Sequence, residues 1–449
     1  MLNPNSTVAP VAQKQRINSL DILRGIALLG ILLINIIHFG LPWPAHINPT
    51  VIGEATEINL QVWKFNNLFF EGAMRAVFSM LFGAGVILFT RKAEEKGAGI
   101  KTADYYYRRI ILLIFFGMVH AYVFLWPGDI LYTYGIMGLF LFPLRNAQPK
   151  ILIGAACVLF IIGALVYHRE YNIMVNLKER ATLAENTIAA GSEPGLPLQR
   201  AQEEWGGVIS ENKPSEEELQ NRVSAMHKGY LGMVRSLMPY IEKQQSLYTY
   251  RFKVWDVLSM MLMGMALFKM RIFNAQKSTR FYLLMAVVGY GIGLTINYLE
   301  INQIVKSNFD PIVLASAERT YHLGRIFTVL GHVGLIMLFC KLPILYWLKH
   351  SLASVGRMAF TNYVMHTVIC NILFLGIGFG LYGMLERYEL YYMVVAIWIF
   401  QMVFSPLWLR YFRYGPLEWA WRSLTYKKLQ PFRKVNPKQE VVLGGAVGG

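Results

Sequence analysis

Four polar side chains interrupt one long apolar stretch, residues 19–40, and their types suit a catalytic or binding site. The stretch SLDILRGIALLGILLINIIHFG contains Asp21, Arg24, Asn35 and His38. An imidazole can accept a proton near neutral pH, an amide can donate a hydrogen bond to a developing oxyanion, and a guanidinium fits phosphate oxygens. On an α-helix with about 100° per residue, Asn35 is rotated by only about 20° from Arg24, and Asp21 and His38 lie about 60° and 40° away on opposite sides. The four side chains therefore share one face of the helix.

That face is unsuited to contact with lipid. An Arg or Asp side chain facing hydrocarbon costs roughly several kcal/mol, so we expect the face to line the bundle interior or a wet cavity. Structural roles stay open for each residue. Asp21 and Arg24 can pair at i and i+3, and Asn35 and His38 can form hydrogen bonds between neighbouring helices.

Other polar residues fall near the two ends of this helix. Near its outer end are His46, Glu71, Arg75, His120, Asp129, Glu318, His322 and Arg325. Near its inner end are Arg108, Arg109 and Arg357. The distribution predicts a polar path with an imidazole-rich outer end and a guanidinium-rich inner end.

Some of these residues have simpler interpretations. Asp129 follows WPG and begins a helix, which is typical of an N-cap. Arg108 and Arg109 are equally typical of a cytoplasmic membrane boundary. The three cysteines of the chain lie in apolar runs without metal-type spacing, so we expect no disulfide, metal site or redox cofactor.

The composition indicates the elements that must position these side chains. The chain has 449 residues, 55% hydrophobic and 16% charged, arranged as apolar runs separated by short polar links. This pattern predicts an all-α polytopic membrane protein rather than a soluble one. The net charge of +16 lies in short links and the C-terminal tail. We therefore expect anionic lipid headgroups as partners, and no nucleic acid.

About ten membrane-spanning helices are predicted from the apolar runs. The expected segments are 20–39, 69–90, 106–125, 129–143, 150–168, 252–271, 280–298, 322–341, 352–376 and 390–411. If both termini are cytoplasmic, most Lys and Arg residues of the links lie on the inner side, which agrees with the positive-inside rule. The expected location is the cytoplasmic membrane of a bacterium.

The region between the fifth and sixth predicted helices is different in kind, because it mixes charged residues with helical apolar spacing. We therefore expect an N-terminal membrane half over 1–168, an extracytoplasmic helical insertion over 169–251, a C-terminal membrane half over 252–412 and a basic cytoplasmic tail over 413–449. The amphipathic second half of the insertion can lie on the membrane, cover a site or pack as a solvated spacer on the outer helix ends.

Several segments resemble the YeiB family of membrane proteins along nearly the whole chain. They are RINSLDILRGIALLGILLINI, VFSMLFGAGVILF, YYRRIILLIFFGMVHAYVFLWPGDILYTYGIMGLFLFPLR, GMALFK, VGRMAFTNYVMH and SPLWLRYFRYGPLEWAWRSLTY. That family is similar, more distantly, to the transmembrane acyltransferase superfamily, which includes heparan-glucosaminide acetyltransferases.

The resemblance implies transfer of an acyl group from cytoplasmic acyl-CoA to a hydroxyl or amine of an extracytoplasmic glycan or similar acceptor. By position it implies His46 as the catalytic base and Asn35 as its partner, with His38 and His120 as rivals of His46. The donor's phosphates would then meet Arg24, Arg108, Arg109 and Arg357. The alternative is a transporter or lipid-handling protein that uses the same polar path, because ionisable residues inside a membrane also mark such paths.

Overall fold

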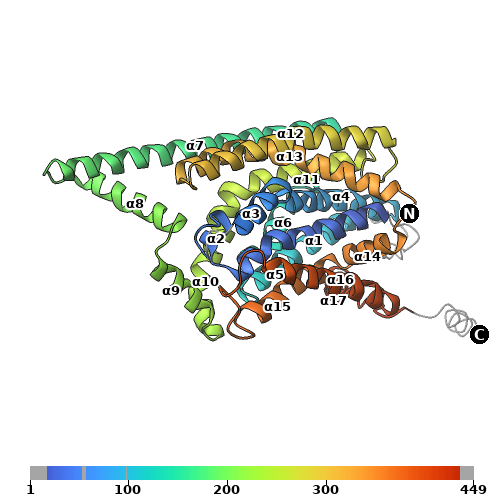
Figure 1. Cartoon of the computed structure of the whole chain (residues 1–449). Coiled ribbons are helices and arrows are strands. Elements are labelled where there is room, and N and C mark those ends of the chain that lie inside the picture. Colours follow the sequence, from blue (N-terminus) through green and yellow to red (C-terminus); the bar gives the residue numbers. More distant parts are fainter. Residues whose placement is uncertain (1–17, 53–56, 98, 435–449) are drawn as a thin grey trace, which may run out of the picture.

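The chain is helical throughout the part that the structure describes. The computed structural model describes residues 18–52, 57–97 and 99–434, and within these ranges the only β-type pairing is an isolated bridge between Phe412 and Arg433. Residues 1–17, the start of the predicted N-terminal membrane half, lie outside the described residues. So do residues 435–449, the end of the predicted basic tail. The all-α class is therefore confirmed, with helices packed roughly side by side along one bundle axis (Figure 1).

The described residues up to 189 form eight helical segments. They are α1 (Asn18–Gly40), α2 (Trp43–Ile47), α3 (Glu57–Phe69), α4 (Ala73–Glu95), α5 (Lys101–Tyr122), α6 (Leu131–Gly138), the 3₁₀ turn η2 (Pro143–Asn146) and α7 (Pro149–Ala189). Three further helices and a π-helical segment follow: α8 (Leu196–Asn212), α9 (Glu216–Met226), α10 (Tyr230–Lys243) and η3 (Gln244–Lys253).

The second half forms seven helices. They are α11 (Val254–Lys269), α12 (Thr279–Lys306), α13 (Pro311–Lys341), α14 (Tyr346–Arg357), α15 (Ala359–Phe374), α16 (Leu390–Tyr411) and α17 (Pro416–Tyr426).

Six stretches of the described residues are long and apolar enough to cross a membrane. They are Asn18–Gly40, Glu57–Glu95, Pro149–Ala189, Thr279–Lys306, Pro311–Lys341 and Leu390–Tyr411. Each of the ten predicted segments also contains a helix, but the others are shorter or less apolar. A protein with several membrane-spanning helices is therefore supported, and the count of ten stays a prediction.

Some helix boundaries differ from the sequence predictions. The segment predicted over 69–90 is interrupted before α4 at Gly72, whose φ of +64° is easily reached only without a Cβ atom. The segment predicted over 129–143 has a helix of only eight residues, α6. The helix predicted to end at 168 continues to Ala189, because no Pro or Gly interrupts residues 164–189.

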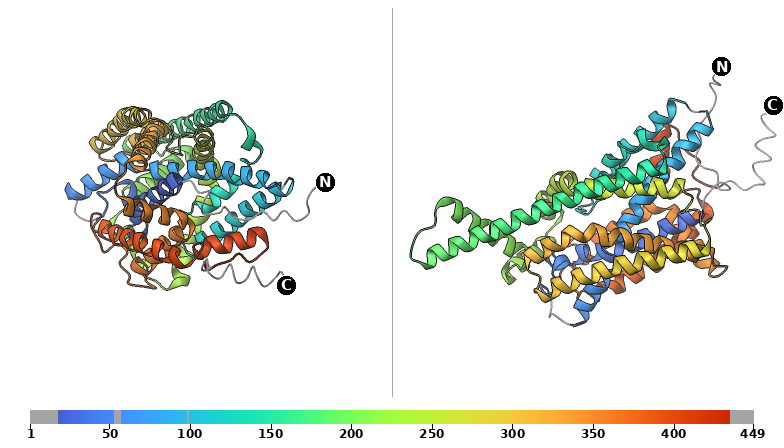
Figure 2. Two further views of the ribbon diagram at one scale, coloured as in Figure 1. Left: turned by 90° about the vertical axis from the view of Figure 1, so that its right-hand side faces the viewer. Right: turned by 90° about the horizontal axis from the view of Figure 1, so that it is seen from above.

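Helix α1 is the central element of the bundle. It packs against α4, α14, α15 and α16, and lies near the middle when the molecule is seen along the bundle axis (Figure 2, left). Gly25 allows its close approach to α14, since a Cβ atom there would lie 2.1 Å from the carbonyl oxygen of Leu352. Most of α1 is buried, and the four residues of its polar face, Asp21, Arg24, Asn35 and His38, are half-buried.

The segment α8–α10 extends beyond one end of the bundle. The end of α7 projects in the same direction, and the chain returns to the bundle through α10 (Figure 1). The hydroxyl of Tyr230 donates a hydrogen bond of 2.9 Å to the carbonyl of Val123, which follows α5. The amphipathic segment is therefore folded back against the bundle end that holds the C-terminus of α1.

Candidate functional site

Two cavities lie at opposite ends of α1. The first, about 290 Å³ in volume, is lined by Asp21 and Arg24 at the start of the helix, and we name it the basic cavity. The second, about 600 Å³, is lined by Asn35 and His38 near the end of the helix, and we name it the histidine cavity. All four polar residues of the α1 face therefore line a cavity, as their spacing predicted.

The basic cavity carries an excess of positive charge. Six basic residues line it against two acidic ones: Arg24, Lys92, Arg109, Arg357, Arg413 and Arg422 against Asp21 and Glu418. Asp21 is paired with Arg24 at 2.9 Å. The Nε and Nη2 atoms of Arg357 are buried and have no hydrogen-bond partner. Because a buried guanidinium strongly favours an anionic partner, this cavity is suited to an anion.

Helix α17 closes one side of the basic cavity through Glu418. The Glu418 carboxylate accepts hydrogen bonds from the backbone N–H groups of Phe360 and Thr361, at 2.7 and 3.1 Å. These groups are at the start of α15, where a carboxylate is favoured by the helix dipole. Glu418 is therefore used in docking α17, and it does not neutralise the arginines around the cavity.

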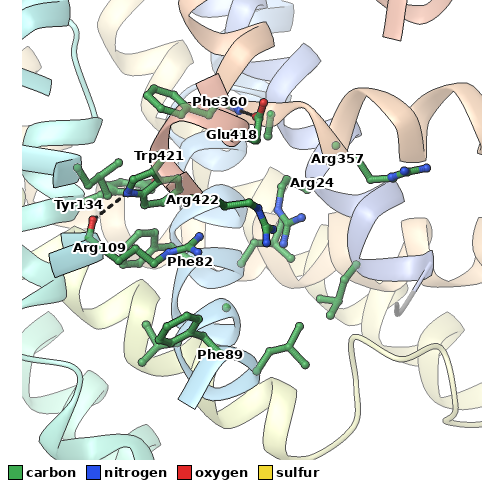
Figure 3. A pocket seen from close by; sticks show the side chains of 18 of the residues that line it. Arg24, Phe82, Phe89, Arg109, Tyr134, Arg357, Phe360, Glu418, Trp421 and Arg422 are labelled. Carbon is green, nitrogen blue, oxygen red and sulfur yellow. Dashed lines mark hydrogen bonds between the residues drawn. The ribbon is translucent and has the colours of Figure 1, made fainter. Parts of the chain in front are cut away.

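The same helix also positions Arg109. The indole N–H of Trp421 donates to the Arg109 carbonyl at 3.0 Å, and the Arg109 guanidinium carbon lies 3.9 Å from the centre of the Trp421 ring (Figure 3). The same lining also contains apolar side chains, such as Phe78, Phe82 and Leu113. The basic cavity is thus amphipathic, with guanidinium groups, aromatic rings and alkyl groups in one lining.

The histidine cavity holds two imidazoles in contact. The ring centres of His38 and His46 lie 4.0 Å apart, and the Nδ1 atom of His38 is buried without a hydrogen-bond partner. Glu71, from the break between α3 and α4, places a carboxylate oxygen 3.9 Å from Nε2 of His46. A polar ligand in this cavity would meet imidazole, amide and carboxylate groups together.

His46 is held in place by its backbone. The indole N–H of Trp63 donates to the His46 carbonyl at 3.2 Å, and Arg387 donates to the carbonyl of Ala45. Burial, with a smaller contribution from the positive charge of Arg387, lowers the pKa of His46 to about 3. His46 is therefore neutral at physiological pH, as a proton acceptor must be.

The segment α8–η3 covers the histidine cavity. Its lining residues include Glu211, Arg222, Tyr240, Lys243 and Lys253. The sequence left open whether the amphipathic segment lies on the membrane, covers a site or packs as a spacer. In the structure these five side chains lie over the cavity. The cavity is thus bounded by bundle helices on one side and by this segment on another.

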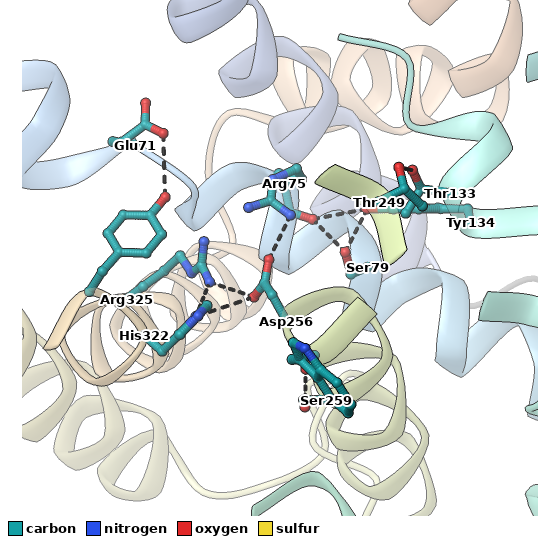
Figure 4. Close-up of polar contacts among 12 residues, drawn as sticks. Glu71, Arg75, Ser79, Thr133, Tyr134, Thr249, Asp256, Ser259, His322 and Arg325 are labelled. Atoms are coloured by element: carbon teal, nitrogen blue, oxygen red, sulfur yellow. Dashed lines mark hydrogen bonds and ion pairs between the residues drawn. The ribbon is translucent and has the colours of Figure 1, made fainter. Parts of the chain in front are cut away.

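A buried ion network supports the wall of the histidine cavity. Asp256 of α11 accepts hydrogen bonds from Arg75 at 2.6 Å and from Arg325 at 2.5 Å (Figure 4). Nδ1 of His322 lies 2.6 Å from the same Arg325 nitrogen. Arg75 lines the cavity, whereas Arg325 lies behind it and is 2% exposed. One carboxylate thus holds two guanidinium groups.

Tyr134 lies between the two cavities and lines both. Its hydroxyl donates to the carbonyl of Arg75 at 3.1 Å and lies 2.6 Å from the hydroxyl of Ser79. These contacts join α6 to α4 at the boundary between the cavities.

The structure brings most of the predicted site residues together in the two cavities. The basic cavity contains Asp21, Arg24, Arg109 and Arg357, and the histidine cavity contains Asn35, His38, His46, Glu71, Arg75 and Asp129. Arg108 lines neither cavity and pairs with Asp104 at 2.7 Å. Arg325 reaches the site only through Asp256.

His120 also lines neither cavity. Its Nδ1 lies 2.8 Å from Asp129, and its Nε2 lies 2.8 Å from the hydroxyl of Thr367. Asp129 accepts the backbone N–H groups of Leu131 and Tyr132 at 3.1 and 2.8 Å, which is the capping role that its sequence position predicted. His120 is therefore a buried partner of a helix cap.

Sequence reasoning missed several lining and supporting residues: Lys92, Tyr134, Lys253, Asp256, Arg413, Glu418, Trp421 and Arg422. A signal existed for Asp256, because it is the only acid in the apolar run 254–268. Among the described residues, no group of three or more His, Cys, Asp or Glu side chains is arranged to hold a metal ion.

The chain is similar to bacterial proteins along nearly its whole length. It is 30% identical over 419 residues to the uncharacterized protein YeiB of Escherichia coli (strain K12), covering 92% of this chain and 97% of that protein. It is 30% identical over 451 residues to the uncharacterized protein YxaH of Bacillus subtilis (strain 168), covering 96% and 99%. The family model "Protein of unknown function (DUF418)" matches residues 267–428. No solved structure matches the chain.

Proposed function

The chain belongs to the YeiB family, and we propose that it is a membrane acyltransferase. The proposed donor is cytoplasmic acyl-CoA, bound by its phosphates in the basic cavity. The proposed acceptor is a hydroxyl or amine of an extracytoplasmic glycan or similar molecule, bound in the histidine cavity. The observation that carries the proposal is the pair of cavities, one rich in guanidinium groups and one with two imidazoles, at the two ends of a single helix.

The basic cavity supports the donor end of the proposal. Guanidinium groups form paired, charge-assisted hydrogen bonds with phosphate oxygens, and Arg357 has two buried nitrogens without partners. The aromatic and alkyl groups of the same lining suit a slender, mostly apolar arm. From Arg24 to Asn35 the helix rises about 16 Å, a length that a pantetheine arm can cover.

The histidine cavity supports the chemical step. His46 takes the proton from the acceptor's O–H or N–H group as that oxygen or nitrogen attacks the thioester carbonyl carbon. The carbon–sulfur bond then breaks, and the thiolate takes the proton from His46, so that CoA leaves as the thiol and the acceptor as an ester or amide. Asn35 donates a hydrogen bond to the oxyanion formed during the attack.

The proposed orientation puts both ends of the chain and the basic cavity in the cytoplasm. One support is the excess of Lys and Arg residues in the predicted inner links. The other is that the beginning of α1 and helix α17, which lie near the two ends of the chain, both line the basic cavity. Anionic lipids of a bacterial cytoplasmic membrane are the proposed partners of the basic links.

Transfer of label from acetyl-CoA tests the proposal. Purified protein is incubated with acetyl-labelled CoA and a glycan fraction from the bacterial envelope, and label in the glycan is measured. We expect transfer by the parent chain and a roughly 10²–10⁴-fold loss in His46→Ala, because a positioned proton acceptor contributes about that factor. His168→Ala, an exposed histidine on α7, is the matched control. Normal transfer by His46→Ala would remove His46 from the mechanism, and no transfer from any acyl donor would refute the enzyme.

A transporter or lipid-handling protein is the second candidate, because the two cavities adjoin each other at Tyr134, which lines both. Flux of a solute or lipid across proteoliposomes that needs Arg24 but no acyl donor would favour it. We expect no such flux from the parent chain.

A further inference from the structure

Tyr134 occupies a unique position between the two cavities. Among the residues that the structure describes, no other side chain lines both the basic cavity and the histidine cavity. Its neighbours on α6 divide between them, since Leu131 lines the basic cavity and Thr133 the histidine cavity. The short helix α6 therefore forms part of the wall that separates the two spaces.

The Tyr134 side chain is held across this boundary by α4. Its hydroxyl contacts Ser79 at 2.6 Å and the Arg75 carbonyl at 3.1 Å, and the Ser79 hydroxyl donates to the same carbonyl at 3.0 Å. Its ring centre lies 5.4 Å from that of Phe82 in an edge-to-face arrangement. At this point the wall is thus an aromatic side chain fixed by hydrogen bonding at its tip and a ring contact at its side.

We infer that Tyr134 is the partition of one continuous path from the basic cavity to the histidine cavity, and that its ring decides the width of the group that passes. When the side chain turns away, the two cavities join beside α1. The hydroxyls of Tyr134 and Ser79 and the Arg75 carbonyl then become free to bond the amide groups of a slender chain. Substitution by a small residue removes the width limit.

If the chain is an acyltransferase as proposed, the group that passes Tyr134 is the acyl end of the donor. The inference on selectivity rests on that proposed function. In an acyltransferase of the proposed kind, the acyl end of the donor must pass Tyr134 before it meets His46. Tyr134 then selects short, unbranched acyl groups. The partition itself does not depend on acyl transfer, so the two claims can be tested separately.

Thiol accessibility tests the partition. The parent for this experiment has its three cysteines, Cys157, Cys340 and Cys370, replaced by alanine and carries Asn35→Cys as its only thiol, in the histidine cavity. It is reconstituted in vesicles of one orientation, and a membrane-impermeant maleimide is applied on the side of the basic cavity. We expect Tyr134→Ala to raise the modification rate roughly tenfold or more, because the rate follows the population of the open path.

Two further variants distinguish a partition from general loosening. Tyr106→Ala is the matched control, because Tyr106 is also buried, also donates to a backbone carbonyl, that of Gly138, and lines the basic cavity alone. We expect it to leave the rate unchanged. Tyr134→Phe keeps the ring and loses the hydroxyl that contacts Ser79 and the Arg75 carbonyl, so we expect a smaller increase than in Tyr134→Ala. An unchanged rate in folded Tyr134→Ala, or an equal increase in Tyr106→Ala, would overturn the inference.

A donor series tests the selectivity. Transfer from acetyl-CoA and from a branched-chain acyl-CoA is compared in the parent and in Tyr134→Ala, and we expect the ratio of branched to acetyl transfer to rise in the variant. A raised thiol rate with an unchanged ratio would retain the partition and reject selection by Tyr134. A raised thiol rate without transfer from any donor would retain the partition and refute the acyltransferase.

Discussion

The two cavities lie on the same helix, yet they balance charge in opposite ways. In the basic cavity, cationic side chains outnumber acids, Glu418 is used in docking α17, and Arg357 has buried nitrogens without partners. In the wall of the histidine cavity, Arg75 and Arg325 share the carboxylate of Asp256, although Nε and Nη1 of Arg325 are also buried without hydrogen-bond partners. The first cavity is therefore arranged for an anionic ligand, whereas the second has its strongest charges already bound within the protein.

The difference indicates which charges stabilise the fold and which await a ligand. A buried ion pair resists loss of either partner, because the remaining charge is left buried. An unmatched buried guanidinium carries a desolvation cost that a ligand can offset. Substitutions in the wall of the histidine cavity should therefore mainly lower stability. Substitutions in the basic cavity should mainly lower the affinity for the donor.

Asp256→Asn should give the largest effect of the comparison, a loss of about 3–5 kcal/mol in stability, because it removes the carboxylate that the half-buried Arg75 and the buried Arg325 share. The measurement is thermal unfolding of the purified protein in detergent, followed by tryptophan fluorescence. Asp21→Asn is the control from the basic cavity. Its pair with Arg24 is partly exposed, so we expect a change of about 1 kcal/mol or less. Equal losses in the two variants would contradict the distinction between the cavities.

Arg357→Leu should have the opposite profile. We expect the affinity for CoA to fall about tenfold to a hundredfold, since a hydrogen bond to a charged group contributes about 1.5–3 kcal/mol, while the unliganded protein unfolds at the same temperature or higher. Calorimetric titration with CoA measures the affinity. Arg108→Leu is the matched control, because Arg108 lines neither cavity and pairs with Asp104. An equal loss of affinity in both variants would show that overall charge, and not the cavity, binds the donor.

The sequence predicted the α1 face because all of its information is local. A spacing of eleven residues places Arg24 and Asn35 on one side of a helix, and the cost of polar groups in lipid determines that this side faces inward. Membrane depth alone grouped Arg109 and Arg357 with Arg108 at the inner end, and only the first two line the basic cavity. The sequence placed His38 and His46 at a similar depth in the membrane but did not predict that they touch. The contact between their rings depends on the loop that leads into α2.

The remaining features depend on contacts that no local pattern contains. Asp256 meets Arg75 across 181 positions of sequence, so its role follows from packing of α11 against α4. Tyr134 is one aromatic residue in an apolar run, and its hydroxyl partners come from another helix. Likewise, Glu418 belongs to an amphipathic helix whose docking site, the start of α15, is formed only in the folded chain.

The smallest expected effect concerns pH: we expect the rate of acyl transfer to change little with pH near neutrality. Burial favours the neutral form of His46 and lowers its pKa to about 3, so the proton is lost at lower pH than from a free imidazole. The active base form is then present from about pH 5 upward, and we expect the rate of acyl transfer to stay flat between about pH 5 and 8. An unshifted histidine would instead lose activity below about pH 6.5.

Arg387 provides a sharper test, because its positive charge is the second cause of the lowered pKa of His46. Arg387→Gln should move the acid limb of the rate profile upward while burial keeps it below that of a free histidine, and Arg387→Lys, which retains the charge, should not. An acid limb near pH 6.5 in the parent chain would show that the working base is exposed to water, and the proton acceptor would then have to be sought outside this buried pair of imidazoles.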